Sequence, residues 1–300
     1  MKRFSMVVLI TALLSCIIVV ALEIAIYRTP NQLKYKDWYM TENADGIKVL
    51  LLGNSLFANS FDPHELGDSV FDGATDARSL YYDKMILKKY APRMGSLKVV
   101  MIPLIVSLYS EPSTSLFFSY PYARYMDLPI GHNPFQYFAL FSGHLVFHSL
   151  EPISISSHVE QVKDYDHDRN MDSVGYSPLF HTWNGYLRNV YIPTYEEGVS
   201  NREAFIQHIG EMATYCNSHG IRFICILPPA ADVYINDVDS RLYDTLYSVM
   251  DYLSKAYHVE YKFYHDDPEF RSDSLYADEL HLNYWGARKF AKRVKQDFGL

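Results

Sequence analysis

Residues 47–55 read Ile47-Lys48-Val49-Leu50-Leu51-Leu52-Gly53-Asn54-Ser55, a short apolar run that ends in a polar turn. An apolar run of this length, closed by a turn, predicts a buried strand over residues 47–52. Residues that follow a strand at the carboxyl edge of an open α/β sheet face the ligand crevice, so the Ser55 hydroxyl could enter a cleft. The same three residue types also form ordinary turns, and the stretch alone does not establish a catalytic serine.

The pattern of strands and helices continues on both sides of this stretch. Further strands are predicted over residues 97–102, 221–227 and 258–263, and amphipathic helices over residues 79–90, 201–218, 240–257 and 284–298. This alternation indicates an α/β fold with a mainly parallel sheet that helices cover on both faces. Residues 110–200 lack the rhythm, and we expect an insertion there that folds over one end of the sheet.

Composition and charge limit the class of protein. The chain has 300 residues, of which 49% are hydrophobic and 21% charged, a globular balance that allows one or two domains. The net charge is -8 and no long basic run occurs, which argues against nucleic acid as a partner. The 26 tyrosines suit a groove for sugars, although tyrosines also pack at the edge of an ordinary core.

The N-terminus is long and apolar. Lys2 and Arg3 precede an apolar run over residues 4–26, which is long enough to cross a hydrocarbon core of about 30 Å. We expect residues 1–27 to be a membrane anchor with the rest of the chain on the extracytoplasmic side, periplasmic or extracellular. A cleaved signal peptide and a lipoprotein signal ending at Cys16 are the alternatives. Polar residues 28–45 are expected to form a juxtamembrane linker.

A second polar stretch near the C-terminus reads Asp278-Glu279-Leu280-His281-Leu282-Asn283. A serine nucleophile needs a neighbouring base, and that base needs an acceptor that holds its tautomer. Asp278 and His281 are three residues apart just before a predicted helix, so both could face one cleft. Alternatively, both residues could be ordinary polar residues at the N-terminus of that helix, without a role in catalysis.

Together these two stretches resemble the sequence blocks of the GDSL/SGNH hydrolases. Gly53-Asn54-Ser55 is similar to the first block, with Asn54 in place of the usual Asp, and the Asp278–His281 stretch is similar to the last. The resemblance covers about residues 47–108 and 201–298. It implies a flavodoxin-like three-layer α/β/α fold, with Ser55 as the nucleophile, His281 as the base and Asp278 as the residue that orients His281.

The chain departs from the family in the blocks that bind the oxyanion. The resemblance makes Gly73 the counterpart of an oxyanion glycine, with the Ser55 backbone N–H as a further donor. The Gly-x-Asn-Asp block is missing from residues 99–107, where Ser107 is a candidate substitute. Losing one oxyanion donor typically costs about 10²–10³ in rate, so catalysis is slow, depends on another donor, or has been lost.

The function expected for residues 46–300 follows from this resemblance. It is serine-dependent hydrolysis or O-acyl transfer on an acylated glycan outside the cytoplasmic membrane, or on another small acyl ester, without a metal or cofactor. The alternative is a catalytically inactive module of the same fold that binds polysaccharide or a partner in envelope assembly.

Three lesser patterns have plainer explanations. Acidic residues over 164–172 resemble a calcium loop but lack the glycine and glutamate that an EF-hand requires, so we expect a solvated loop. The histidines at His132, His144, His148 and His158 lack the spacing of a zinc site. Cys216 and Cys225 could form a bridge, but two buried thiols are the expectation.

Overall fold

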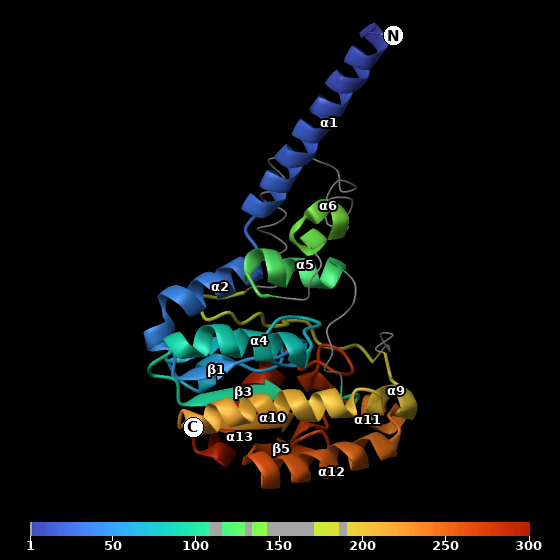
Figure 1. Cartoon of the computed structure of the whole chain (residues 1–300). Helices are drawn as coiled ribbons and strands as arrows, with labels where there is room; N and C mark the ends of the chain where they lie inside the picture. Colours follow the sequence, from blue (N-terminus) through green and yellow to red (C-terminus); the bar gives the residue numbers. More distant parts are fainter. Residues whose placement is uncertain (1, 109–115, 130–133, 143–170, 186–190) are drawn as a thin grey trace. The chain divides into compact units, whose positions relative to one another are not determined.

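A computed structural model describes residues 2–108, 116–129, 134–142, 171–185 and 191–300 (Figure 1). The chain divides into two compact units. The smaller comprises Met1–Asp37 and Ser113–Asp168, and the larger comprises Trp38–Pro112 and Arg169–Leu300. Each unit has a hydrophobic core of its own.

The larger unit is built on a five-stranded sheet. Its strands are β1 (Val49–Leu51), β2 (Val70–Asp72), β3 (Val99–Pro103), β4 (Arg222–Leu227) and β5 (Glu260–Phe263). They lie in the order β2-β1-β3-β4-β5, and all neighbouring pairs are parallel. This is the strand order of flavodoxin-like folds, so the predicted α/β class with a parallel sheet is confirmed.

Helices cover both faces of the sheet. The long ones are α4 (Leu80–Tyr90), α10 (Arg202–Ser218), α12 (Ser240–Tyr257) and α13 (Tyr284–Phe298). Phe290 of α13 shares a buried cluster with Met101 and Ile224, one from β3 and one from β4. Side chains alternate along a strand, so the buried Val100 and Phe223 point to the opposite face. There α10 contacts β4 and packs against both α4 and α12.

Shorter segments complete the larger unit. They are α3 (Ser55–Ala58), α9 (Tyr195–Val199), α11 (Asp232–Asp237) and the 3-10 turns η1 (Ala44–Gly46), η2 (Pro63–Glu65), η3 (Ala91–Arg93), η5 (Pro268–Phe270) and η6 (Asp273–Leu275). Strand β2 was not among the predicted strands. It has three residues, too few for a periodic pattern, and its pairing with β1 defines it.

The smaller unit is helical. It contains α1 (Lys2–Arg28), the start of α2 (Gln32–Glu42), α5 (Leu116–Tyr125), the 3-10 turn η4 (Pro134–Tyr137) and α6 (Ala139–Ser142). Residues 32–42, within the segment expected to be a linker, therefore form a helix. In α1, Arg3–Arg28 contains an 18-residue window with a mean hydropathy of 2.8 and no buried residue, and it is the described helix that is long and apolar enough to cross a membrane. Such a helix suits an anchor or a signal peptide.

Candidate active site

Ser55 lies in a tight turn between β1 and α3. Asn54 caps α3, because its side-chain oxygen accepts a hydrogen bond from the Leu56 backbone N–H at 3.0 Å. Gly53 has φ +116°, and a Cβ added there would overlap the ring of Pro103. The turn thus requires glycine at position 53, and it presents Ser55 as the first residue of α3 at the carboxyl end of β1.

Asp278 and His281 lie in the loop that precedes α13. One carboxylate oxygen of Asp278 accepts hydrogen bonds from the backbone N–H groups of Leu280 at 2.9 Å and His281 at 2.7 Å. Both oxygens lie 3.0 Å from Nδ1 of His281. Asn283 then caps α13 through the N–H groups of Trp285 and Gly286. The loop therefore fixes the carboxylate and the imidazole against each other.

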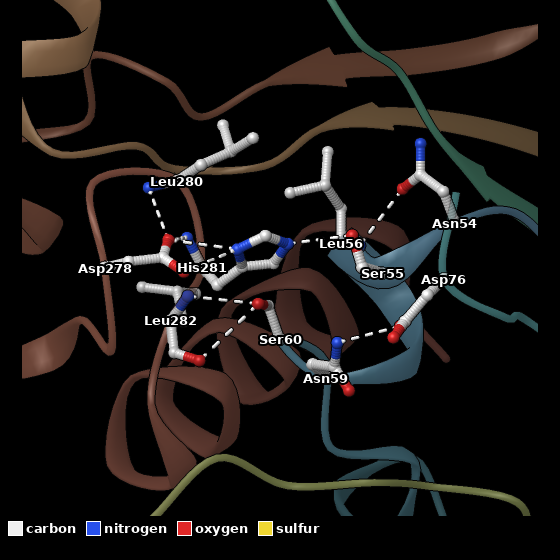
Figure 2. A network of polar contacts seen from close by, with 10 residues as sticks. All are labelled: Asn54, Ser55, Leu56, Asn59, Ser60, Asp76, Asp278, Leu280, His281 and Leu282. Atoms are coloured by element: carbon white, nitrogen blue, oxygen red, sulfur yellow. Dashed lines mark hydrogen bonds and ion pairs between the residues drawn. The ribbon is translucent and has the colours of Figure 1, made fainter. Parts of the chain in front are cut away.

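The two stretches meet in space. Nε2 of His281 lies 2.8 Å from Oγ of Ser55, so the three side chains form one hydrogen-bonded row (Figure 2). With the proton of His281 on Nδ1, that nitrogen donates to Asp278 and Nε2 accepts from the Ser55 hydroxyl. This tautomer is the one a serine nucleophile requires of its base.

The charge of Asp278 is stabilised within the site. Burial would raise its pKa, but hydrogen bonds from His281 and from two backbone N–H groups lower the pKa to about 2. Asp278 is therefore ionised at neutral pH, where its negative charge favours a developing imidazolium on His281.

Polar contacts just after α3 hold this segment in place. Oγ of the buried Ser60, just after α3, accepts a hydrogen bond from the backbone N–H of Leu282 at 3.0 Å. Asn59 donates from its side chain to Asp76 at 3.1 Å. The Ser60 contact joins the two halves of the site, and it was not predicted, because nothing in the local sequence distinguishes a polar residue with a partner 222 positions away.

A buried ion pair supports the turn before Ser55. Arg78 and Asp83 have almost no exposed side-chain surface and lie 3.3 Å apart. Asp83 accepts the Gly53 backbone N–H at 2.9 Å, and Arg78 donates to the Gly73 carbonyl at 2.7 Å and to the Thr75 hydroxyl. Burial raises the pKa of Asp83, and Arg78 and the Gly53 N–H oppose this rise. The pair thereby ties the segment after β1 to the segment after β2.

The expected oxyanion residues differ in their availability. The Gly73 backbone N–H donates to the Leu51 carbonyl at 2.8 Å as part of the sheet, which occupies the donor that its expected role needs. The Ser55 backbone N–H makes no hydrogen bond to the described residues. Ser107 follows β3 and lines an open pocket.

Three hollows in the larger unit share Ile105. One, of about 20 Å³, is lined by Leu56 and Leu280, next to Ser55 and His281, and by the buried His265. In Figure 2 the side chains of Leu56 and Leu280 extend to the same side of the row of Ser55, His281 and Asp278. A small one borders Gly53 and Arg78, and an open one of about 670 Å³ contains Ser107, Tyr191, Glu196, Ser200 and Asn201. The hollow that adjoins Ser55 and His281 is thus small, and the large open pocket lies at Ser107.

Burial lowers the pKa of His265, which lines the hollow beside Leu56 and Leu280, although Asp266 nearby opposes the shift. The Nδ1 atom of His265 is buried without a hydrogen-bond partner among the described residues. Its ring stacks on Tyr243, with centroids 4.4 Å apart. His265 is therefore neutral at physiological pH. It was not predicted as a site residue, because the sequence around it, just after β5, contains no recognisable motif.

The lesser patterns are only partly described. His132, His144, His148, His158 and the acidic residues up to 170 lie outside the described residues. Asp172 caps a turn, accepting the N–H groups of Val174 and Tyr176, and contacts His64 at 2.7 Å. Within the described ranges, no group of three or more His, Cys, Asp or Glu residues is placed to hold a metal ion.

The two cysteines of the larger unit are not bridged. Cys216 and Cys225 are buried free thiols, as expected from the sequence. Burial raises the pKa of the Cys216 thiol to about 12. Neither thiol is suited to nucleophilic chemistry, because the reactive form is the thiolate.

The chain resembles several solved structures in its fold. No protein-family model matches the chain, and no curated protein matches it by sequence. A candidate acylhydrolase from Bacteroides fragilis is 11% identical, over 87% of this chain and 95% of its own, with a TM-score of 0.41. A GDSL-like lipase from Bacteroides thetaiotaomicron is 13% identical, over 89% and 100%, with a TM-score of 0.40. A mutant acetyl-xylooligosaccharide esterase from Geobacillus is 9% identical, over 85% and 95%, with a TM-score of 0.44. These solved neighbours are GDSL/SGNH hydrolases, matched at low identity.

Proposed function

We propose that the chain is a serine-dependent acyl-ester hydrolase or O-acyltransferase. In this proposal Ser55 is the nucleophile, His281 is the general base and acid, and Asp278 orients and stabilises His281. The observation that carries it is the hydrogen-bonded row of the three side chains, with distances of 2.8 Å and 3.0 Å. A serine hydroxyl is a weak nucleophile until an adjacent base accepts its proton, and this row supplies that base.

The reaction proceeds in two halves. As Oγ of Ser55 attacks the ester carbonyl carbon, Nε2 of His281 takes the hydroxyl proton. His281 returns that proton to the leaving alcohol as the carbon–oxygen bond breaks, which leaves the acyl group on Ser55. Water or a sugar hydroxyl then attacks the acyl-enzyme and gives its proton to His281, which returns it to Ser55. Hydrolysis and transfer differ only in this second nucleophile.

The developing oxyanion needs hydrogen-bond donors. The Ser55 backbone N–H makes no hydrogen bond within the described residues and is the first candidate. The Ser107 hydroxyl is the second, since Ser107 follows the neighbouring strand β3. The Gly73 N–H is occupied by Leu51, so we expect a lower rate than a full set of donors would give.

We further propose that the substrate is an acylated glycan or another small acyl ester outside the cytoplasmic membrane. Residues 4–26 act as the anchor, and Lys2 and Arg3 favour an N-terminus on the cytoplasmic side. The open pocket of about 670 Å³ supports a hydroxyl-rich ligand, because an aromatic ring, carboxylates and hydroxyls line it.

One observation favours the alternative of an inactive binding module, namely the occupied N–H of Gly73. A binding role would not require Ser55 and His281 to share a hydrogen bond, so we regard the enzyme as the better proposal.

Hydrolysis of p-nitrophenyl acetate by the full chain in detergent tests this proposal. We expect wild-type turnover and a loss of at least about 10³-fold in Ser55→Ala. Ser248→Ala, which removes an exposed hydroxyl from α12, is the matched control and should retain activity. Adding an oligosaccharide acceptor separates the two reactions, since transfer yields an acetylated sugar in place of free acetate. Equal turnover in wild type and Ser55→Ala would contradict the proposal.

A further inference from the structure

The C-terminal turns of the apolar helix α1 pack within the smaller unit. Leu22 and Ile26 contact a small buried cluster formed by Tyr120 of α5 and Ala139 of α6. The end of the apolar run therefore contacts two further segments that are more than 90 residues away in the sequence. Figure 1 labels these segments as α5 and α6.

Glu23 fixes α6 beside α1. It is the one charged residue in the apolar run of residues 4–26. Its carboxylate accepts hydrogen bonds from the backbone N–H groups of Ala139 at 3.1 Å and Leu140 at 2.8 Å. A carboxylate inside an apolar helix is costly in a membrane unless it has partners, and α6 provides them.

The segment that satisfies Glu23 exposes large apolar side chains. Phe135, Phe138, Leu140 and Phe141, here called the aromatic patch, are 49%, 48%, 38% and 51% exposed. The ring centroid of Phe141 lies 4.6 Å from that of Phe135 and 6.2 Å from that of Phe138, so the rings form one cluster. Clustered exposed aromatic rings of this kind mark a surface that contacts another apolar phase.

The position of Glu23 along α1 sets the depth of this patch. From Arg3 to Glu23 the helix rises about 30 Å, at about 1.5 Å per residue, which equals the thickness of a typical hydrocarbon core. If α1 enters the membrane at Arg3, Glu23 lies at the opposite boundary between acyl chains and headgroups. The backbone N–H of Leu140, a residue of the aromatic patch, donates to Glu23 and so holds the patch at this boundary.

Tyr27, in the last turn of α1, is surrounded by a second tyrosine and two cations. The rings of Tyr27 and Tyr125 stack with centroids 6.4 Å apart. The Lys34 ammonium lies 4.7 Å from the centre of the Tyr27 ring, and the Arg124 guanidinium lies 4.2 Å from it. Tyrosine rings at the headgroup level and cations beside phosphates are the usual composition of a membrane interface.

From these contacts we infer that the aromatic patch inserts into the lipid bilayer beside α1, as a second membrane contact at the boundary between acyl chains and headgroups. The inference rests on the membrane anchor in the proposed function and is independent of the chemistry at Ser55. The occupant is the lipid bilayer, because the patch is continuous with the end of a membrane-length helix.

Photolabelling of the full chain in phosphatidylcholine liposomes tests the inference. The probe is a phospholipid with a diazirine on its acyl chain, and the labelled residues are mapped by mass spectrometry. We expect label in α1 and in residues 135–141. Phe138→Ser/Phe141→Ser should lose most label from the patch and keep that in α1, whereas Phe138→Trp/Phe141→Trp should retain both.

Other outcomes would overturn the inference in distinguishable ways. Label in α1 without label in the patch would leave the anchor intact and remove the patch as a lipid contact. Label in neither would remove the anchor as well. Cross-links between copies through the patch, without lipid label there, would show that a second chain covers it. Serine labelling at position 55 is measured separately, so failure of the enzymatic proposal would not affect this result.

Discussion

Nε2 of His281 lies 2.8 Å from Oγ of Ser55, although the two residues are 226 positions apart in the chain. Ser55 follows strand β1, the neighbour of the central strand β3, and His281 lies in the loop before the last helix, α13. In the strand order β2-β1-β3-β4-β5, the chain adds β2 on one side of β1 and the later strands on the other side. The switch point therefore lies between β1 and β3, and ligands bind at such points in open α/β folds. The sheet thus brings together a hydroxyl and an imidazole that the sequence keeps at its opposite ends.

Removing the charge of Asp278 should impair catalysis with little change in the shape of the site. Asp278→Asn keeps the size of the side chain but favours the wrong tautomer of His281, so we expect kcat to fall about 10³–10⁴-fold. Steady-state hydrolysis of p-nitrophenyl acetate measures this. Asp251→Asn, at an exposed carboxylate on α12, is the control and should leave kcat unchanged. A kcat within about threefold of wild type would remove Asp278 from the mechanism.

The stability of the larger unit should fall in acid because of the same residue. The pKa of Asp278 is about 2 in the folded chain, against about 3.9 in an unfolded one. A carboxyl group with a lowered pKa contributes stability above its unfolded pKa, and this contribution is lost as the pH falls from about 4 to about 2. It is on the order of 2–3 kcal/mol, because the shift is about two pKa units and each unit is worth about 1.4 kcal/mol.

Urea denaturation at pH 5 and pH 2.5 measures this loss. Asp278→Asn should lose less stability between the two pH values than wild type. Ser55→Ala keeps the pair of Asp278 and His281 and should lose as much as wild type. Identical losses in all three proteins would contradict the assigned pKa.

Glycine at position 53 should be required for the turn that presents Ser55. Gly53→Ala places a Cβ against Pro103 at a φ of +116°, so we expect a loss of about 2 kcal/mol or more and slower labelling of Ser55. Gly46→Ala is the matched control, because a Cβ there meets no atom within 4 Å. Urea denaturation compares the two, and equal stability would show that the turn adapts to a side chain.

The buried pair of Arg78 and Asp83 should be important for stability. Arg78→Met leaves the Asp83 carboxylate buried without its cation, which typically costs about 3–5 kcal/mol. Arg241→Met removes an exposed arginine that pairs with Asp239, and it should change stability little. The double variant Arg78→Met/Asp83→Asn should recover part of the loss. If Arg78→Met is no less stable than Arg241→Met, the pair has no supporting role.

The sequence predicted the parts of the fold that have local patterns. Strands β1, β3, β4 and β5 lie within or next to the predicted strands. The first three are mostly apolar because buried parallel strands are covered on both faces, whereas the edge strand β5 is half-buried. Strand β2 has three residues and was missed, since only its partner β1 defines it. Helix α2, in the expected linker, was missed because its apolar residues show no clear helical stripe.

The candidate site was predictable only where a motif identified it. Ser55, Asp278 and His281 were found through their resemblance to known blocks, and their proximity is a consequence of the sheet order. Gly73 was assigned by analogy, but the sheet uses its N–H for the Leu51 carbonyl. Supporting contacts such as Ser60 with Leu282 depend on tertiary packing, which leaves no periodic signal in the sequence.

Fluorophosphonate labelling of the full chain, read by intact mass and peptide mapping, tests the central claim most directly. The account predicts one adduct, on Ser55, that disappears in Ser55→Ala and is strongly reduced in His281→Ala, because the probe reacts only with an activated serine. A folded wild-type protein that takes up no probe, or one labelled equally well in His281→Ala, would contradict a serine activated by His281.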